Sequence, residues 1–158
     1  MKQILLVIDL QPAFAVEPNY GKIIQYIKEH KTEYDMVIAT RFINHKDSPF
    51  VKKLGFDIAM TREKLEFPYD ILLGKPTYGC GEGLCNKTLK GNQVTVIGCD
   101  TDACILATCF EMFQYGVDFH VLADYCYSSG GDDYHKSALA FIERNFGPDS
   151  VVEEGDAE

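Results

Sequence analysis

The sequence predicts an α/β fold, a three-layer αβα sandwich in which helices cover both faces of a mainly parallel, six-stranded sheet. Two observations predict this class. Short apolar runs alternate along the chain with segments of helical periodicity. These runs are mainly apolar, and the first is uninterrupted from Ile4 to Ile8, which is typical of parallel strands buried on both faces. With 158 residues, the chain is long enough for one domain, which we expect to span residues 1–152, followed by a solvated acidic tail at 153–158.

Six segments are expected to form the strands. They are short and mainly apolar, and they cover residues 4–9, 36–42, 70–75, 94–98, 117–124 and 151–152. Right-handed crossovers and the commonest arrangement of six such strands give the order 3-2-1-4-5-6. Strands one and four are then neighbours where the strand order reverses, and ligands bind beyond the carboxyl ends of strands at such a point.

Five helical segments are expected between the strands. They cover residues 20–31, 50–54, a short stretch ending near 89, 101–115 and 133–146. The segment 101–115 has the clearest apolar face and ends before Gly116, a residue suited to helix termination. The last segment follows Asp132, a good N-cap, and ends at Gly147 before a proline.

Charge and composition restrict the class of partner. The chain carries 15 basic and 24 acidic residues, a net charge of −9, which disfavours nucleic acid and anionic membranes as partners. No apolar run approaches the roughly 20 residues of a membrane-spanning helix, and the N-terminal run at 4–8 is shorter than a secretory apolar region. We therefore expect a cytoplasmic protein with reduced cysteines that acts on a small, neutral molecule.

Three residues at strand ends form a candidate catalytic group. Asp9 ends the first strand, Lys75 ends the third, and Cys104 lies near the start of the helix after the fourth. A helix start and a nearby cation lower the pKa of a thiol, and a carboxylate can accept its proton. These residues are thus a candidate base, cation and nucleophile. Each also has an ordinary interpretation, as a helix cap, a solvated lysine and a buried core cysteine respectively.

Four motifs in order along the chain match one known family. They are VIDLQ at 7–11 followed by Phe14, KPTY at 75–78, GCDTDACI at 98–105, and SSGG at 128–131 followed by His135. With these motifs, essentially the whole chain resembles the isochorismatase-like cysteine hydrolases, which include nicotinamidases and N-carbamoyl amide hydrolases. The resemblance implies a cofactor-free Asp-Lys-Cys triad of Asp9, Lys75 and Cys104 that cleaves an amide-type C–N bond through a thioester.

The resemblance also implies features around the triad. A non-proline cis peptide at Cys99–Asp100 would direct the N–H of Asp100, together with that of Cys104, at a developing oxyanion. Phe14, Tyr78 and Thr101 lie in or beside the matching motifs, and we expect them to contact the substrate. Family relatives are commonly oligomeric, so a homodimer or homotetramer is expected.

Metal sites are not expected. Nicotinamidases of this family add a site of one Asp and two His after the second strand, where this chain has only His45. Cys80 and Cys85 have a zinc-like spacing, but no second cysteine or histidine pair accompanies them. The role of His135, near the active site or simply on the last helix, stays open. Two functional alternatives also stay open: an isochorismatase-type hydrolase acting on another bond, and a catalytically idle relative serving as a thiol redox sensor or binding protein.

Overall fold

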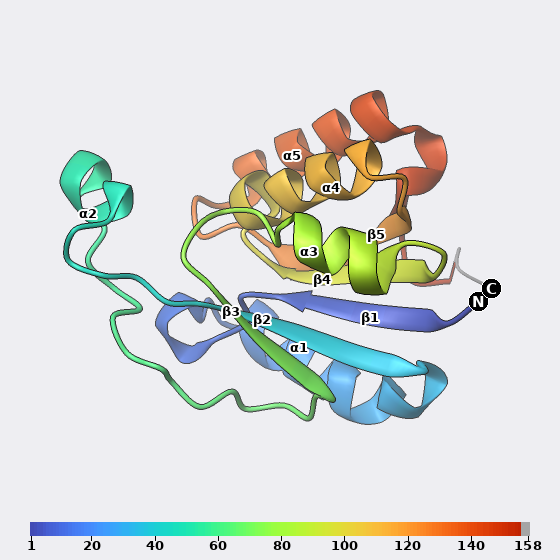
Figure 1. Cartoon of the computed structure of the whole chain (residues 1–158), viewed down its shortest axis with the longest axis horizontal. Coiled ribbons are helices and arrows are strands. Elements are labelled where there is room, and N and C mark those ends of the chain that lie inside the picture. The colour runs from blue at the N-terminus through green and yellow to red at the C-terminus, as the bar shows by residue number, and fades with distance from the viewer. Residues whose placement is uncertain (156–158) are drawn as a thin grey trace.

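The computed structural model describes residues 1–155, and its central feature is one parallel sheet of six strands (Figure 1). The strands are β1 (Gln3–Ile8), β2 (Met36–Phe42), β3 (Ile71–Lys75), β4 (Gln93–Cys99), β5 (Asp118–Tyr127) and β6 (Val151–Val152). Their order is β3-β2-β1-β4-β5-β6, which confirms the predicted topology. Residues 156–158 of the expected acidic tail lie outside the described residues.

Helices cover both faces of the sheet. They are α1 (Asn19–His30), α2 (Pro49–Leu54), α3 (Glu82–Leu84), α4 (Leu106–Gln114) and α5 (Asp132–Phe146). Helix α1 covers one face and α3, α4 and α5 cover the other, whereas α2 stands apart, beyond the carboxyl ends of the strands (Figure 1). None of the helices within residues 1–155 is both long and apolar enough to cross a membrane.

Strand β1 supplies side chains to two separate cores. Leu5 and Val7 pack with α1 on one face, while Ile4, Leu6 and Ile8 pack with α4 and α5 on the other. All five side chains are completely buried, because successive residues of a strand point to opposite faces and both faces are covered. Each contributes roughly 1.5–3 kcal/mol through its burial. This rigid central strand ends at Asp9.

Gly98 allows the backbones of β1 and β4 to come close at their carboxyl ends. Its φ is +121°, and an added Cβ would clash with the backbone of Ile8. The β4–β5 pairing is irregular at the same point, between Val96 and Gly98. One residue later, the thiol of Cys99 donates to the carbonyl oxygen of Asp9 at 3.4 Å. The end of β4 is thereby fixed against the end of β1.

Two predicted elements differ from the structure. The segment 101–115 is not one α-helix, because a wider π-helical turn (Thr101–Ile105) precedes α4. In this turn the carbonyl of Asp100 accepts from both Ala103 N and Ile105 N at 3.1 Å. Strand β5 runs to Tyr127 rather than to residue 124, because its last residues pair with the end of β4 beyond the irregularity.

Candidate active site

A cavity of about 430 Å³ opens at the carboxyl ends of β1 and β4. Its wall is mainly apolar and includes five aromatic side chains: Phe14, Phe42, Phe50, Phe56 and Tyr78. Side chains that carry polar groups also line it: Asp9, Asp100, Cys104 and Ser129. The cavity therefore lies where the topology predicts a ligand site, and it brings together residues separated by about a hundred positions in the sequence.

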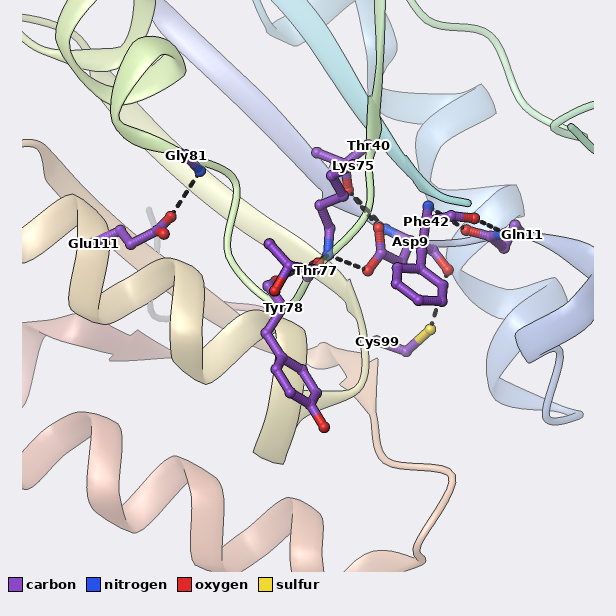
Figure 2. A network of polar contacts seen from close by, with 10 residues as sticks. All are labelled: Asp9, Gln11, Thr40, Phe42, Lys75, Thr77, Tyr78, Gly81, Cys99 and Glu111. Atoms are coloured by element: carbon purple, nitrogen blue, oxygen red, sulfur yellow. Dashed lines mark hydrogen bonds and ion pairs between the residues drawn. The ribbon is translucent and has the colours of Figure 1, made fainter. Parts of the chain in front are cut away.

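Asp9 lines this cavity, and polar contacts to Thr40 and Lys75 hold its carboxylate (Figure 2). Its side chain is only 1% exposed, and its φ of 49° turns the chain sharply away from β1. The Thr40 hydroxyl donates to Oδ1 at 2.8 Å and accepts from the Asp9 N–H at 3.1 Å. The other carboxylate oxygen, Oδ2, forms an ion pair with Nζ of Lys75 at 2.7 Å and has no further hydrogen-bond partner among residues 1–155. Thr40 and Lys75 together hold the Asp9 carboxylate in one orientation.

Lys75 reaches Asp9 from the edge strand β3, past the end of β2 (Figure 2). Its ammonium donates to the carbonyl oxygens of Thr77 at 2.7 Å and Tyr78 at 2.9 Å. Burial by itself would lower the pKa of Lys75, but the neighbouring Asp9 carboxylate and Cys104 sulfur outweigh it and raise that pKa. Lys75 is thus a permanent cation at neutral pH, with its three donors directed at three oxygens.

Cys104 lines the cavity together with Asp9, near enough to the ion pair for the charges of Asp9 and Lys75 to affect the pKa of its thiol. It is carried by the π-helical turn before α4 and is partly buried. Burial and the negative charge of Asp9 raise its pKa, and Lys75 opposes them only in part. The lowered pKa expected from the helix start is therefore wrong. The raised pKa keeps the Cys104 thiol neutral at neutral pH.

Asp100 lines the cavity just before the turn that carries Cys104, and its peptide bond to Cys99 is cis, as the resemblance implied. Its carboxylate accepts from the backbone N–H of Ser129 at 2.9 Å and from the Ser129 hydroxyl at 2.5 Å. Burial raises the pKa of Asp100, and the two hydrogen bonds from Ser129 oppose that rise. The side chain of Asp100 is thus occupied by the 128–131 loop.

The remaining residues predicted for the site fall into two groups. Phe14 and Tyr78 line the cavity, and the Tyr127 hydroxyl donates to the carbonyl of Phe14 at 2.8 Å. Thr101 does not line it: its side chain is completely buried, and its hydroxyl is paired with Nδ1 of His135 at 2.7 Å. His135 therefore contacts the turn that carries Cys104 through its first residue, Thr101, and not through the cavity.

Much of the cavity wall was missed by sequence reasoning. Residues 42–58 supply Phe42, Phe50, Leu54, Phe56 and Ile58 to it. The Asn44 side chain fixes this segment, because its amide donates to the carbonyls of Phe56 at 2.8 Å and Ile58 at 3.2 Å. The sequence signal that could have indicated this wall is the number of Phe residues in 42–58, a segment with little helical or strand periodicity. His45, the only histidine in this segment, is exposed.

The fold and the cavity first define a class: a doubly wound α/β protein with a buried ion pair and a thiol at its topological switch point. Comparison with known proteins then gives the family. The sequence model of the Isochorismatase domain matches residues 3–153. This chain therefore belongs to the isochorismatase family of hydrolases.

Several individual proteins are similar to this chain. Ureidoacrylate amidohydrolase RutB of Methylobacterium radiotolerans is 31% identical over 105 residues, which are 64% of this chain but only 41% of that relative. Nicotinamidase PncA of Bacillus subtilis superposes with a TM-score of 0.77 at 19% identity, covering 98% of this chain and 100% of the other. An isochorismatase-like hydrolase of Alkaliphilus metalliredigens gives 0.76 at 15% identity, covering 97% and 94%. These two structures agree with this chain in fold.

Proposed function

We propose that this protein hydrolyses a C–N bond in a small, neutral amide, ureido or carbamoyl compound through a thioester on Cys104. The observation that carries the proposal is that Asp9 and Cys104 line one mainly apolar cavity while Lys75 forms an ion pair with Asp9. The names of the amidohydrolase and nicotinamidase relatives support the bond type.

The first half of the proposed reaction forms the thioester. Oδ2 of Asp9 accepts the thiol proton of Cys104 as the sulfur attacks the substrate carbonyl carbon. Lys75 stabilises the negative charge as it moves from the carboxylate to the sulfur. The N–H groups of Asp100 and Cys104 are proposed to bind the tetrahedral oxyanion, and one such donor is typically worth about 2.7–4 kcal/mol.

The second half releases both products. The proton held by Asp9 passes to the leaving nitrogen, so ammonia or an amine departs and the acyl group remains on sulfur. A water molecule then attacks the thioester carbonyl while Asp9 accepts its proton, and the thiol is restored when that proton returns to sulfur. The overall reaction consumes one water molecule and yields an acid and an amine, with no change of oxidation state.

The charge of the cavity favours a neutral substrate. Its described lining contains aromatic and aliphatic side chains and two carboxyl groups, but no Lys, Arg or His. The nearby Lys75 ammonium has all three of its donors directed at protein oxygens. A substrate carboxylate would be desolvated beside Asp9 and Asp100 without a partner, which is unfavourable.

Ammonia release tests the proposal and its substrate class together. Purified protein is assayed with matched pairs of aryl or alkyl amides and ureas, one member neutral and the other carrying a carboxylate. We expect turnover of neutral members with kcat/KM at least about tenfold above their anionic partners, a difference of ~1.4 kcal/mol. Cys104→Ala should release no ammonia, and rapid quenching of the wild type should give an acylated Cys104 by mass spectrometry. Turnover that survives in Cys104→Ala contradicts the thioester route.

The site does not favour the redox-sensor alternative. Sensor thiols react as thiolates, so they have lowered pKa values and open access to solvent. The pKa of Cys104 is raised by burial and by Asp9 instead. Peroxide sensitivity of Cys104 without any turnover in the amide and urea panel would reverse this assignment.

We also propose self-association through the outer face of α4 and α5. Three phenylalanine side chains on these helices are about half exposed: Phe110 at 47%, Phe113 at 56% and Phe141 at 53%. Light scattering at micromolar concentration should give a dimer or tetramer for the wild type and a smaller species for Phe113→Glu. Tyr69→Glu, a matched change at an exposed residue near β3, should leave the mass unchanged. A monomeric wild type would refute self-association.

A further inference from the structure

Folding brings two thiols and a carboxylate together outside the cavity. Cys80 lies in the loop after β3, Cys85 begins the π-helical turn Cys85–Leu89, and Glu111 lies on α4. Their ligand atoms all lie within 4.8 Å of one another. None of the three lines the cavity, and the proposed hydrolysis does not use them.

We propose that Cys80, Cys85 and Glu111 form a binding site for a zinc-type divalent cation, with the fourth position occupied by water. The distance between the two sulfur atoms is 3.7 Å. Two thiolates bound at about 2.3 Å to a tetrahedral zinc ion lie about 3.8 Å apart, so the sulfurs already have the required spacing. Two thiolates and a carboxylate also match the ligand preference of zinc rather than of magnesium or calcium.

The two residues that flank Cys80, Gly79 and Gly81, both lie against the Glu111 carboxylate. An added Cβ at Gly79 would clash with that carboxylate, so only glycine permits this approach. Gly81, with φ +93°, directs its N–H at Oε2 of Glu111 at 2.8 Å (Figure 2). Two glycines on either side of Cys80 thus accommodate and orient the third ligand, which is how outer-shell contacts position metal ligands.

Access and charge are consistent with a bound cation. Cys80 and Glu111 are partly exposed, whereas Cys85 is completely buried and anchors the site in the α4–α5 core. Binding of Zn²⁺ to two thiols and one carboxylate releases two protons to solvent and leaves one net negative charge on the site.

Glu111 could not have been found from cysteine and histidine spacing, because it lies on a helix, 26 residues beyond Cys85.

An ion here would fasten the loop that positions Lys75. Cys80 follows Tyr78 by two residues, and the Tyr78 carbonyl accepts from Nζ of Lys75 at 2.9 Å. The third proposed metal ligand, Glu111, belongs to α4, the helix that continues from the turn carrying Cys104. The cation would therefore connect the loop that follows Lys75 with the helix that follows Cys104. Its role would be structural, and it would take no part in the reaction.

Zinc binding to the full-length protein tests the site directly. Protein kept reduced with a non-thiol reductant competes with a chromophoric chelator for Zn²⁺, and Co²⁺ loading is followed by the thiolate-to-cobalt charge-transfer absorption. We expect one ion per chain in the wild type and in Cys104→Ala, which keeps the proposed ligands. Glu111→Gln should weaken binding by at least about tenfold, and Cys80→Ser should remove the charge-transfer band.

A control variant and a folding check show whether a bound ion is held by Cys80, Cys85 and Glu111. Glu143→Gln, an exposed glutamate on α5, is the matched control and should bind like the wild type. Circular dichroism establishes that Glu111→Gln is folded, so its weaker binding reports the lost ligand. The proposal is overturned if reduced wild type binds no stoichiometric ion, if binding is lost in Cys104→Ala, or if the two thiols only form a disulfide.

Discussion

Replacement of Asp9 by Asn is expected to reduce turnover by about 10²–10⁴-fold while making the Cys104 thiol easier to alkylate. The loss reflects removal of the proposed general base. The gain has an electrostatic cause. Burial and the Asp9 charge raise the pKa of Cys104 and Lys75 lowers it, so removal of the carboxylate leaves burial alone to oppose Lys75 and the pKa falls.

Iodoacetamide labelling against pH, read by mass spectrometry, measures this second effect. Because the Cys104 pKa is raised, labelling of the wild type should still increase with pH above 9, whereas in Asp9→Asn the increase should occur at lower pH. Asp124→Asn removes an exposed carboxylate from the same fold and should match the wild type in both assays. Slower labelling in Asp9→Asn at every pH would show that Asp9 is not what raises the pKa of Cys104.

Replacement of Lys75 by Met is expected to lower the free energy of unfolding by about 3–5 kcal/mol, besides abolishing turnover. The substitution leaves the Asp9 carboxylate buried at 1% exposure without its cation, and an unpaired buried charge is strongly destabilising. The double variant Asp9→Asn/Lys75→Met should recover much of this loss, because it removes both charges. Urea unfolding of the wild type, Asp9→Asn, Lys75→Met and the double variant gives the coupling energy between Asp9 and Lys75.

The pH dependence of this loss follows from the pKa of Lys75. Because folding raises that pKa above its ordinary 10.5, the ammonium stabilises the fold fully below that value and loses its effect only as pH rises through the higher folded value. The difference between wild type and Lys75→Met should therefore be constant from neutral pH to about 10 and decrease above it. A difference that already falls between pH 7 and 9 would contradict a raised pKa.

Topology could be predicted from the sequence because it follows from local patterns and general rules. The uninterrupted run from Ile4 to Ile8 identifies a strand buried on both faces, and handedness with the usual strand order places its end beside β4. Asp9, Lys75 and Cys104 were found because each lies at or just after the end of a strand. Their proximity needed only the topology.

Features that depend on distant contacts were not predictable in this way. The helix start near Cys104 indicated a lowered pKa, but burial and the charge of Asp9, 95 residues earlier, decide the direction. The end of β5 depends on an irregular pairing with β4 that no local pattern reveals. Thr101 was assigned to substrate contact by its place in a motif, yet its hydroxyl turns to His135.

The position of α2 has a consequence for how proteins of this kind diversify. The proposed reacting groups lie at the ends of β1 and β3 and on the turn after β4, whereas Phe50, Leu54, Phe56 and Ile58 reach the cavity from a segment that includes α2, which stands apart from the sheet (Figure 1). Replacement of these side chains would reshape the space around the substrate without disturbing either hydrophobic core. Substitutions within residues 50–58 are therefore expected to change which molecules fit the cavity while leaving Asp9, Lys75 and Cys104 in place.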